Sequence, residues 1–138
     1  MREIALHMAD IAENSLAAGA ARIRLSVMID RAADRLTTAV EDNGRGMDAD
    51  TLYRCTDPFM TTRTARRVGL GLALFKLSAE QSGGSFTIRS EQGRGTRAEA
   101  AYIISGIDRA PLGSIAETMA ALIAANPETD FTLEYAAD

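Results

Sequence analysis

Two stretches of alternating residues, separated by only a short turn, constrain the fold of this chain more than any other feature. The side chains expected to face inward are Ile23, Leu25, Val27 and Ile29 in the first stretch and Leu36, Thr38 and Val40 in the second. Alternation of this kind is typical of strands with one buried face. Because only a turn at 32–34 separates the two strands, we expect them to pair as an antiparallel hairpin.

Helices are predicted on both sides of this hairpin, over residues 3–18 and 70–82, and each run ends at a glycine. The expected inward stripes are Ile4, Met8, Ile11 and Ser15 in the first helix and Leu70, Leu74, Leu77 and Ser78 in the second. Two further strands follow, one around Phe86 and Ile88 and one from Thr96. Because the strands come in hairpins rather than in strict alternation with helices, the predicted fold is an α+β two-layer sandwich.

Two smaller helices are predicted from their N-caps. Asp48 caps a short helix, 49–55, within the turn-rich segment 41–68. Ser114 and Glu117 form a capping box for a helix over 115–125, and a short strand, 131–135, follows it. We expect residues 106–138 to be a C-terminal extension packed on the same domain as residues 1–105.

Composition excludes several classes of protein. The 138 residues suit one domain, and a net charge of −4 leaves no excess of cations for a nucleic acid backbone. The single cysteine, Cys55, cannot form an internal disulfide, which favours a reducing compartment. Neither a signal peptide nor an apolar run of about 18 residues is present. We therefore expect a cytoplasmic protein whose partners include neither nucleic acid nor a membrane.

The first helix carries the first of four clusters that core packing does not require. Asp10 and Asn14 are four positions apart and share one helix face, and His7 lies one turn earlier. A carboxylate and an amide oxygen on one face can hold a hard cation such as Mg²⁺ or orient a water molecule. The alternative is an ordinary solvated helix face.

The second cluster, 41–47, follows the second strand of the hairpin. By strand parity Asp42 points inward, where a carboxylate needs hydrogen-bond donors. The exocyclic amine of a ligand would supply one, and Gly44 and Gly46 would permit positive φ and the close approach of a flat ring to the backbone. The alternative is an Asn-Gly hairpin turn.

The third and fourth clusters are rich in glycine. The segment 69–72, GLGL, opens the predicted helix at 70–82, where free N–H groups can bind phosphate, although its spacing matches neither a P-loop nor the dinucleotide fingerprint. The preceding residues, 61–67, hold three arginines and three threonines, which suits a phosphate-binding lid or a solvated loop. The segment 93–96, GRGT, places the Thr96 hydroxyl on the inward face of a strand and is otherwise a β-turn.

In this order and at these separations, the clusters resemble the nucleotide-binding boxes of the GHKL superfamily, which includes gyrase, MutL and histidine-kinase ATPase domains and anti-sigma-factor kinases. The matching segments are ENSLAAGA at 13–20 (N-box), DNGRGM at 42–47, GLGL at 69–72 and GRGT at 93–96 (glycine boxes), and DPFMTTR at 57–63 (F-box). The resemblance covers residues 3–104. The short length and the tail are similar to small stand-alone ATP-binding proteins of anaerobic bacteria.

The resemblance implies the Bergerat fold, a mixed, largely antiparallel sheet that helices cover on one face, with Mg-ATP bound between helices and a lid. It implies that Asp42 accepts the adenine amino group and that Thr96 supports this contact. It implies that Asn14 coordinates Mg²⁺ and that Asp10 is the general base. The other implied cofactor-binding residues are Ala18, Gly44, Gly46, Met47, Thr61, Thr62, Arg63, Gly69, Leu70, Gly71 and Leu72.

The leading functional hypothesis is a histidine-kinase-like ATPase domain that acts in trans. A histidine kinase normally carries a pair of dimerisation helices with its phosphoacceptor histidine, and 138 residues leave no room for them. The chain is therefore expected to bind Mg-ATP and to phosphorylate or regulate an unidentified protein partner, with His, Ser, Thr or water as the acceptor. The alternative is a non-catalytic adaptor whose lid orders when ATP binds. One cysteine and one histidine disfavour a redox or transition-metal protein.

Overall fold

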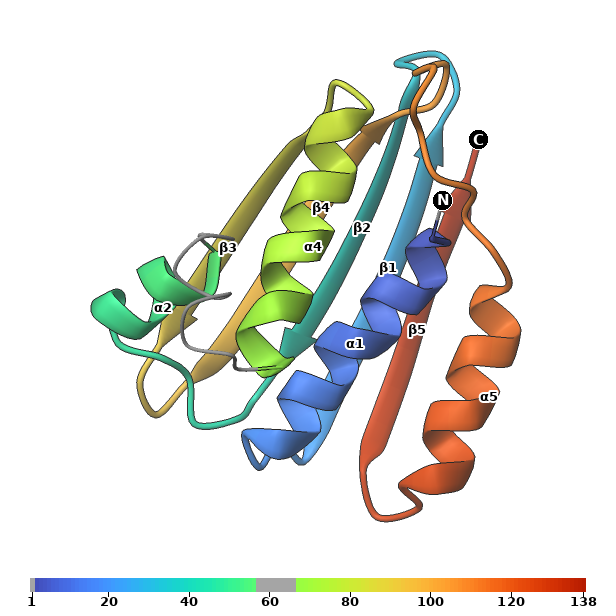
Figure 1. Cartoon of the computed structure of the whole chain (residues 1–138). Coiled ribbons are helices and arrows are strands. Elements are labelled where there is room, and N and C mark those ends of the chain that lie inside the picture. Colours follow the sequence, from blue (N-terminus) through green and yellow to red (C-terminus); the bar gives the residue numbers. More distant parts are fainter. Residues whose placement is uncertain (1, 57–66) are drawn as a thin grey trace.

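The computed structural model describes residues 2–56 and 67–138. Its elements are α1 (Ile4–Ala17), β1 (Arg22–Asp30), β2 (Arg35–Asp42), α2 (Ala49–Thr56), α4 (Arg67–Gln81), β3 (Ser85–Glu91), β4 (Gly95–Ile103), α5 (Ile115–Ala125) and β5 (Asp130–Ala137). The described strands form one five-stranded sheet in the order β3-β4-β2-β1-β5. Figure 1 shows α1, α4 and α5 lying on the same face of this sheet. The predicted α+β two-layer sandwich is confirmed.

The sheet is mixed but largely antiparallel. β1 pairs with β2, β2 with β4 and β3 with β4 in antiparallel register, whereas β5 runs parallel to β1 at the edge of the sheet. The hairpin predicted for the first two strands is therefore confirmed. In the β2–β4 register Asp42 lies opposite Thr96, which brings two of the four clusters together at one end of the sheet.

The core lies between the helices and the sheet. The inward stripe predicted for the first helix is confirmed, because all its members, Ile4, Met8, Ile11 and Ser15, are buried. From the sheet, Val27, Val40 and Tyr102 are fully buried under the helices. The helix ends at Gly19, whose φ of +78° suits a glycine after a helix C-cap.

The predicted stripe of the 70–82 helix is largely wrong. Its members Leu70, Leu74 and Leu77 are 40%, 37% and 43% exposed, whereas the buried face carries Leu72, Ala73, Phe75, Ala79 and the predicted Ser78. The helix has two apolar stripes, and helical spacing alone does not distinguish them. The stripe with small residues is buried because it lets the helix lie close to α1, as the contact of Gly71 with that helix shows.

The C-terminal segment adds a helix and a strand to the same layers. α5 packs against α1, and β5 extends the sheet beside β1. The Ser114 side chain accepts a hydrogen bond from the Glu117 N–H, as the capping box predicts, and Asp48 likewise accepts from the Thr51 N–H at the start of α2. The connection between β4 and α5 is held to α1 by the Ile4 N–H, which donates to the Pro111 carbonyl at 2.8 Å.

The buried face of α4 generates a stability prediction. Phe75 is fully buried, so Phe75→Ala is expected to lower the free energy of unfolding by about 3–5 kcal/mol. The control Leu77→Ala, two residues along the same helix and 43% exposed, is expected to cost about 1 kcal/mol or less. Urea denaturation measures both. A cost for Leu77→Ala equal to that of Phe75→Ala would contradict this assignment of the helix faces.

Candidate functional site

Asp42 ends β2 and is the centre of the candidate site. Its side chain points toward the helix layer, as strand parity predicts. One carboxylate oxygen, Oδ2, accepts a hydrogen bond from the Ser15 hydroxyl of α1 at 2.6 Å, and the other, Oδ1, accepts from the Gly44 N–H at 2.8 Å. A carboxylate has about four acceptor positions. Asp42 is therefore held in place by the protein and can still accept a hydrogen bond from a ligand.

Ser90, on β3, links Thr96 of β4 to the loop that follows Asp42. Thr96 lies opposite Asp42 in the sheet, and the hydroxyl oxygens of Thr96 and Ser90 are 2.7 Å apart. The Met47 N–H donates to the same Ser90 oxygen at 2.8 Å. The structure thus brings together Asp42, Met47 and Thr96, which the family resemblance implies lie around one ligand.

The glycines of the 42–47 segment serve mainly to pack the loop against the protein. Gly44 does not have a positive φ, in contrast to the expectation; instead, a Cβ on it would lie 3.0 Å from both Cβ and the carbonyl oxygen of Ala18. Gly46 has a φ of +71°, and its Cβ would lie 2.0 Å from the Glu91 carbonyl oxygen. The Arg45 N–H donates to the Ala18 carbonyl at 3.0 Å. The loop is therefore fixed between α1 and the β3–β4 turn.

Asp10 and Asn14 lie on the face of α1 that meets α4. A Cβ on Gly71 would be 3.6 Å from both the Asn14 amide nitrogen and the Asp10 Cβ. The carboxylate of Asp10 forms an ion pair with Arg2 at 2.7 Å. The structure therefore brings the first and third clusters together, and Asn14 is the chain neighbour of Ser15, which contacts Asp42.

The start of α4 differs from the prediction. The helix begins at Arg67 rather than at residue 70. In such a helix the Gly69 N–H lies in the first turn, where backbone donors have no intrahelical partner, while Leu70, Gly71 and Leu72 lie in the second turn. Of the amides expected to bind phosphate, that of Gly69 lies in the first turn of α4, and Gly71 lies close to α1. Thr61, Thr62 and Arg63 lie outside the described residues.

His7, one turn before Asp10, is buried between α1 and α4 and stacks on Phe75 with a ring-centroid distance of 6.1 Å. Burial is the main cause that lowers its pKa, and the nearby Arg2 lowers the pKa further, while Asp10 acts in the opposite direction. His7 is therefore neutral at pH 7. Its Nδ1 atom has no hydrogen-bond partner in the described part of the chain.

Sequence reasoning missed three residues of this region. Ser15 was expected only as part of the buried stripe, although it is adjacent to Asn14 and reaches Asp42. Ser90 lies opposite Thr96 on β3, and its inward parity was the available signal. Arg2 carried no signal, because its contact with Asp10 depends on how the chain enters α1.

The opposite face of the sheet carries a separate, charged surface. Arg24, Glu41 and Arg97 form a chain of ion pairs across β1, β2 and β4, at 3.7 and 3.9 Å. Two shallow hollows lie over this surface, and Asp42 and Thr96 form part of their margin. Because Arg24, Glu41 and Arg97, which line these hollows, lie on the face of the sheet away from α1 and α4, the hollows are not the predicted ligand site.

The donor set fits magnesium bound together with phosphate. Among the described residues, no three His, Cys, Asp or Glu side chains come together as a metal site. Mg²⁺ in phosphate sites usually has only one or two protein ligands and completes its octahedron with phosphate oxygens and water. The Asn14 amide oxygen, beside Gly71 of α4, suits that role, and the Asp10 carboxylate lies one helical turn away.

Comparison with known families agrees with this geometry. Residues 2–103 match the family model described as "Histidine kinase-, DNA gyrase B-, and HSP90-like ATPase". The chain belongs to this family. The family has the same α+β fold, and its printed description names ATPases.

Curated relatives of this histidine-kinase-like domain include sensor kinases. The chain is 43% identical over 108 residues to the sensor protein kinase FleS of Pseudomonas aeruginosa. The aligned region covers 78% of this chain and 26% of FleS. It is 34% identical over 89 residues to the alginate biosynthesis sensor protein KinB of the same species, which covers 64% of this chain and 15% of KinB. The chain therefore spans about a quarter or less of the length of these relatives. Within its described part, it has no helix with the length and apolarity needed to cross a membrane.

The Ser15–Asp42 contact generates a second prediction. Ser15→Ala is expected to lower the free energy of unfolding by about 1–3 kcal/mol, because a hydrogen bond to a charged group is lost. In an Asp42→Ala background the same change is expected to cost clearly less, since the partner is already absent. Urea denaturation of the four proteins of this cycle gives the coupling energy. Equal costs of Ser15→Ala in both backgrounds would show that the two side chains do not interact.

Proposed function

We propose that this chain binds Mg-ATP and acts in trans, as a protein kinase or as a regulator of a partner protein. The observation that carries the proposal is the continuity of one surface across α1, β2 and α4. Ser15 contacts Asp42, its chain neighbour Asn14 lies beside Gly71, and Asp10 lies one turn further along the same helix. A ligand with a polar base at one end and phosphates at the other matches this order of groups, and the family supports ATP.

At the base end, Asp42 accepts a hydrogen bond from the adenine amino group. Ser15 and the Gly44 N–H hold the carboxylate in a fixed orientation, which lowers the entropy lost on binding. Thr96, fixed by Ser90, supports this contact from the neighbouring strand. The other residues proposed beside the base are Ala18, Gly44, Gly46 and Met47.

At the phosphate end, Asn14 holds Mg²⁺ through its amide oxygen, and the bound metal neutralises phosphate charge. The first turn of α4 directs free N–H groups and its positive dipole end toward the phosphates. The oxygen or nitrogen atom of the attacking group bonds to the terminal phosphorus, the bond from that phosphorus to the ADP oxygen breaks, and ADP leaves. Asp10 takes the proton that the attacking group loses. The other residues proposed here are Thr61, Thr62, Arg63, Gly69, Leu70, Gly71 and Leu72.

A kinase-type reaction is supported by the relatives, because their printed names describe sensor kinases. We propose that the chain supplies the ATP-binding part of such a reaction. Residues 106–138 belong to the ATP-binding domain in this proposal, because β5 pairs with β1 and α5 packs on α1.

A second candidate is a non-catalytic adaptor that presents a surface to its partner only when ATP is bound. The exposed leucines of α4 favour a partner, because Leu70, Leu74 and Leu77 lie at helical spacing on one solvent-facing stripe. Phosphate release, or labelling of a partner from radiolabelled ATP, favours the kinase. Tight ATP binding without either result favours the adaptor.

Calorimetry with Mg-ATP tests the proposed adenine contact. The wild-type chain is expected to bind Mg-ATP, and Asp42→Asn is expected to weaken binding by about 1–3 kcal/mol, or about 5-fold to 150-fold. The reason is that the amide replaces one acceptor oxygen with a donor, which opposes the adenine amino group. Asp108→Asn, an exposed aspartate outside the site, is the matched control with the same change in charge.

The control is expected to leave the affinity within about twofold of the wild type. No binding of Mg-ATP by the wild-type chain would contradict the proposed function. Unchanged affinity of Asp42→Asn would instead show that Asp42 is not the acceptor for adenine.

A further inference from the structure

We propose that this site prefers ATP to ADP and that Arg2 causes this preference, because the Arg2 guanidinium neutralises Asp10 beside the position of the terminal phosphate. The inference rests on the proposed function and adds a residue and a selectivity to it. Arg2 lies outside every segment that resembles a nucleotide-binding box and reaches the site through its ion pair with Asp10.

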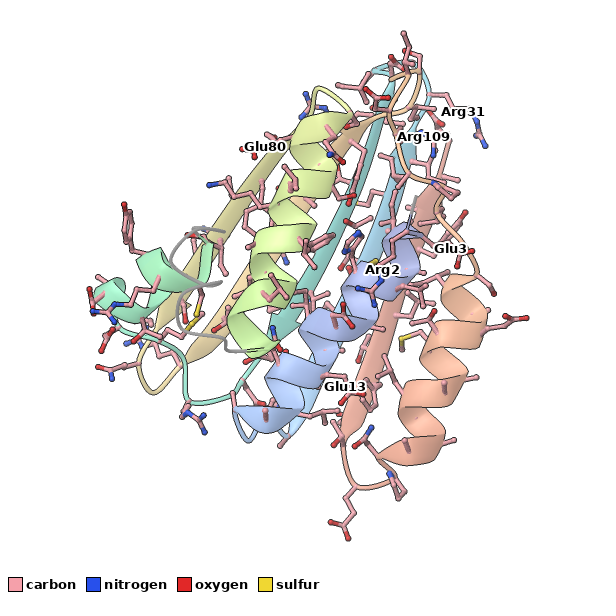
Figure 2. All side chains as sticks on the ribbon, viewed as in Figure 1. Arg2, Glu3, Glu13, Arg31, Glu80 and Arg109 are labelled. Atoms are coloured by element: carbon pink, nitrogen blue, oxygen red, sulfur yellow. The ribbon has the colours of Figure 1, made fainter. Side chains whose placement is uncertain are left out.

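The contact is a direct ion pair at the N-terminal part of α1, where Figure 2 labels Arg2. The guanidinium Nη1 atom lies 2.7 Å from Asp10 Oδ2, and the two side chains are 41% and 36% exposed. Ion pairs exposed to this degree contribute little to the stability of a fold. The pair is therefore better explained by what it does to the charge of the surface than by what it adds to folding.

The order of residues along α1 places Asp10 at the far end of the phosphates. Ala18 and Ser15 contact the loop and the carboxylate at the base end, Asn14 comes next, and Asp10 follows one turn later. Eight residues from Ala18 to Asp10 correspond to about 12 Å along the helix axis. A triphosphate that starts from a base at Asp42 and passes Asn14 therefore brings its last phosphate closest to Asp10.

A bare carboxylate at this position opposes the last phosphate. Two negative charges a few ångströms apart near a protein surface repel strongly enough to lower affinity about tenfold or more. ADP lacks the phosphate that lies closest to Asp10, so it feels this repulsion less. A cation on Asp10 consequently favours ATP more than it favours ADP.

Arg2 is the cation that the structure supplies. Within residues 2–56 and 67–138 it is the partner that forms an ion pair with Asp10. His7 is the other basic side chain beside Asp10, but its burial and its lowered pKa keep it neutral at pH 7. The guanidinium stays charged at every physiological pH. The compensation therefore does not depend on a titrating group.

The test compares nucleotide affinities in a double-mutant cycle. Dissociation constants for Mg-ATP and Mg-ADP are measured by calorimetry, at one salt concentration, for the wild type, Arg2→Met, Asp10→Asn and the double variant. Arg2→Lys keeps the charge, and Arg35→Met removes an exposed arginine at the start of β2 as the matched control. Urea denaturation verifies that each variant is folded.

Arg2→Met is expected to weaken Mg-ATP about tenfold and Mg-ADP about twofold or less. In the Asp10→Asn background the same change is expected to alter Mg-ATP affinity less than about threefold, because no carboxylate remains to be neutralised. Arg2→Lys and Arg35→Met are expected to stay within about threefold of the wild type for both nucleotides.

Equal losses for ATP and ADP in Arg2→Met, or a loss of ATP affinity that persists in the Asp10→Asn background, would overturn the inference while leaving the proposed function intact. A wild-type chain that binds neither nucleotide would overturn both. If Arg2→Met does not fold, Arg2→Lys and Asp10→Asn still test the inference. A loss of the preference for ATP in Arg2→Lys, or a weaker preference for ATP in Asp10→Asn, would contradict charge compensation.

Discussion

The rest of the site depends on the Asp42 carboxylate at the end of β2. Strand parity turns this side chain toward the helices, and the Ser15 hydroxyl and the Gly44 N–H supply the donors that a partly buried carboxylate requires. The same contacts join the C-terminal half of α1 to the end of the sheet. Because Asn14 precedes Ser15 in the chain, fixing Asp42 also fixes where the metal-binding amide of the proposed function lies. One partly buried hydrogen bond thus sets the spacing between the two ends of the proposed nucleotide site.

Electrostatics divides this surface into two parts with different requirements. At the Asp42 end a negative charge is useful, because an amine has to be recognised. Within the described residues, Asp42 is held by the Ser15 hydroxyl and the Gly44 N–H rather than by a cation. At the Asp10 end a negative charge would oppose phosphate, and Arg2 neutralises it. The buried, neutral His7 separates this ion pair from the core around Phe75. The arrangement accounts for two carboxylates in one site without a conflict with a polyanionic ligand.

Much of the fold could be predicted from local sequence patterns, and each wrong prediction has a physical cause. Alternation in 23–29 and 36–40 predicted the hairpin, and the capping box at Ser114 predicted α5, because both signals are local. The stripe of α4 was wrong because that helix carries two apolar faces and only packing against α1 selects between them. In the site, parity predicted the direction of Asp42. The bridging role of Ser90 and the Arg2–Asp10 pair are tertiary contacts that no local pattern specifies.

The central claim is that one surface, running from Asp42 to Asn14, receives the base and the phosphates of a single ligand. The most direct measurement is of the backbone amide chemical shifts of the chain, recorded by NMR while adenosine and then Mg-ATP are added. Adenosine is predicted to shift the amides of Asp42, Gly44 and Thr96, and Mg-ATP to extend the shifts to Asn14 and Gly71. Shifts confined to Arg89 and Arg97, on the opposite face of the sheet, would contradict the claim.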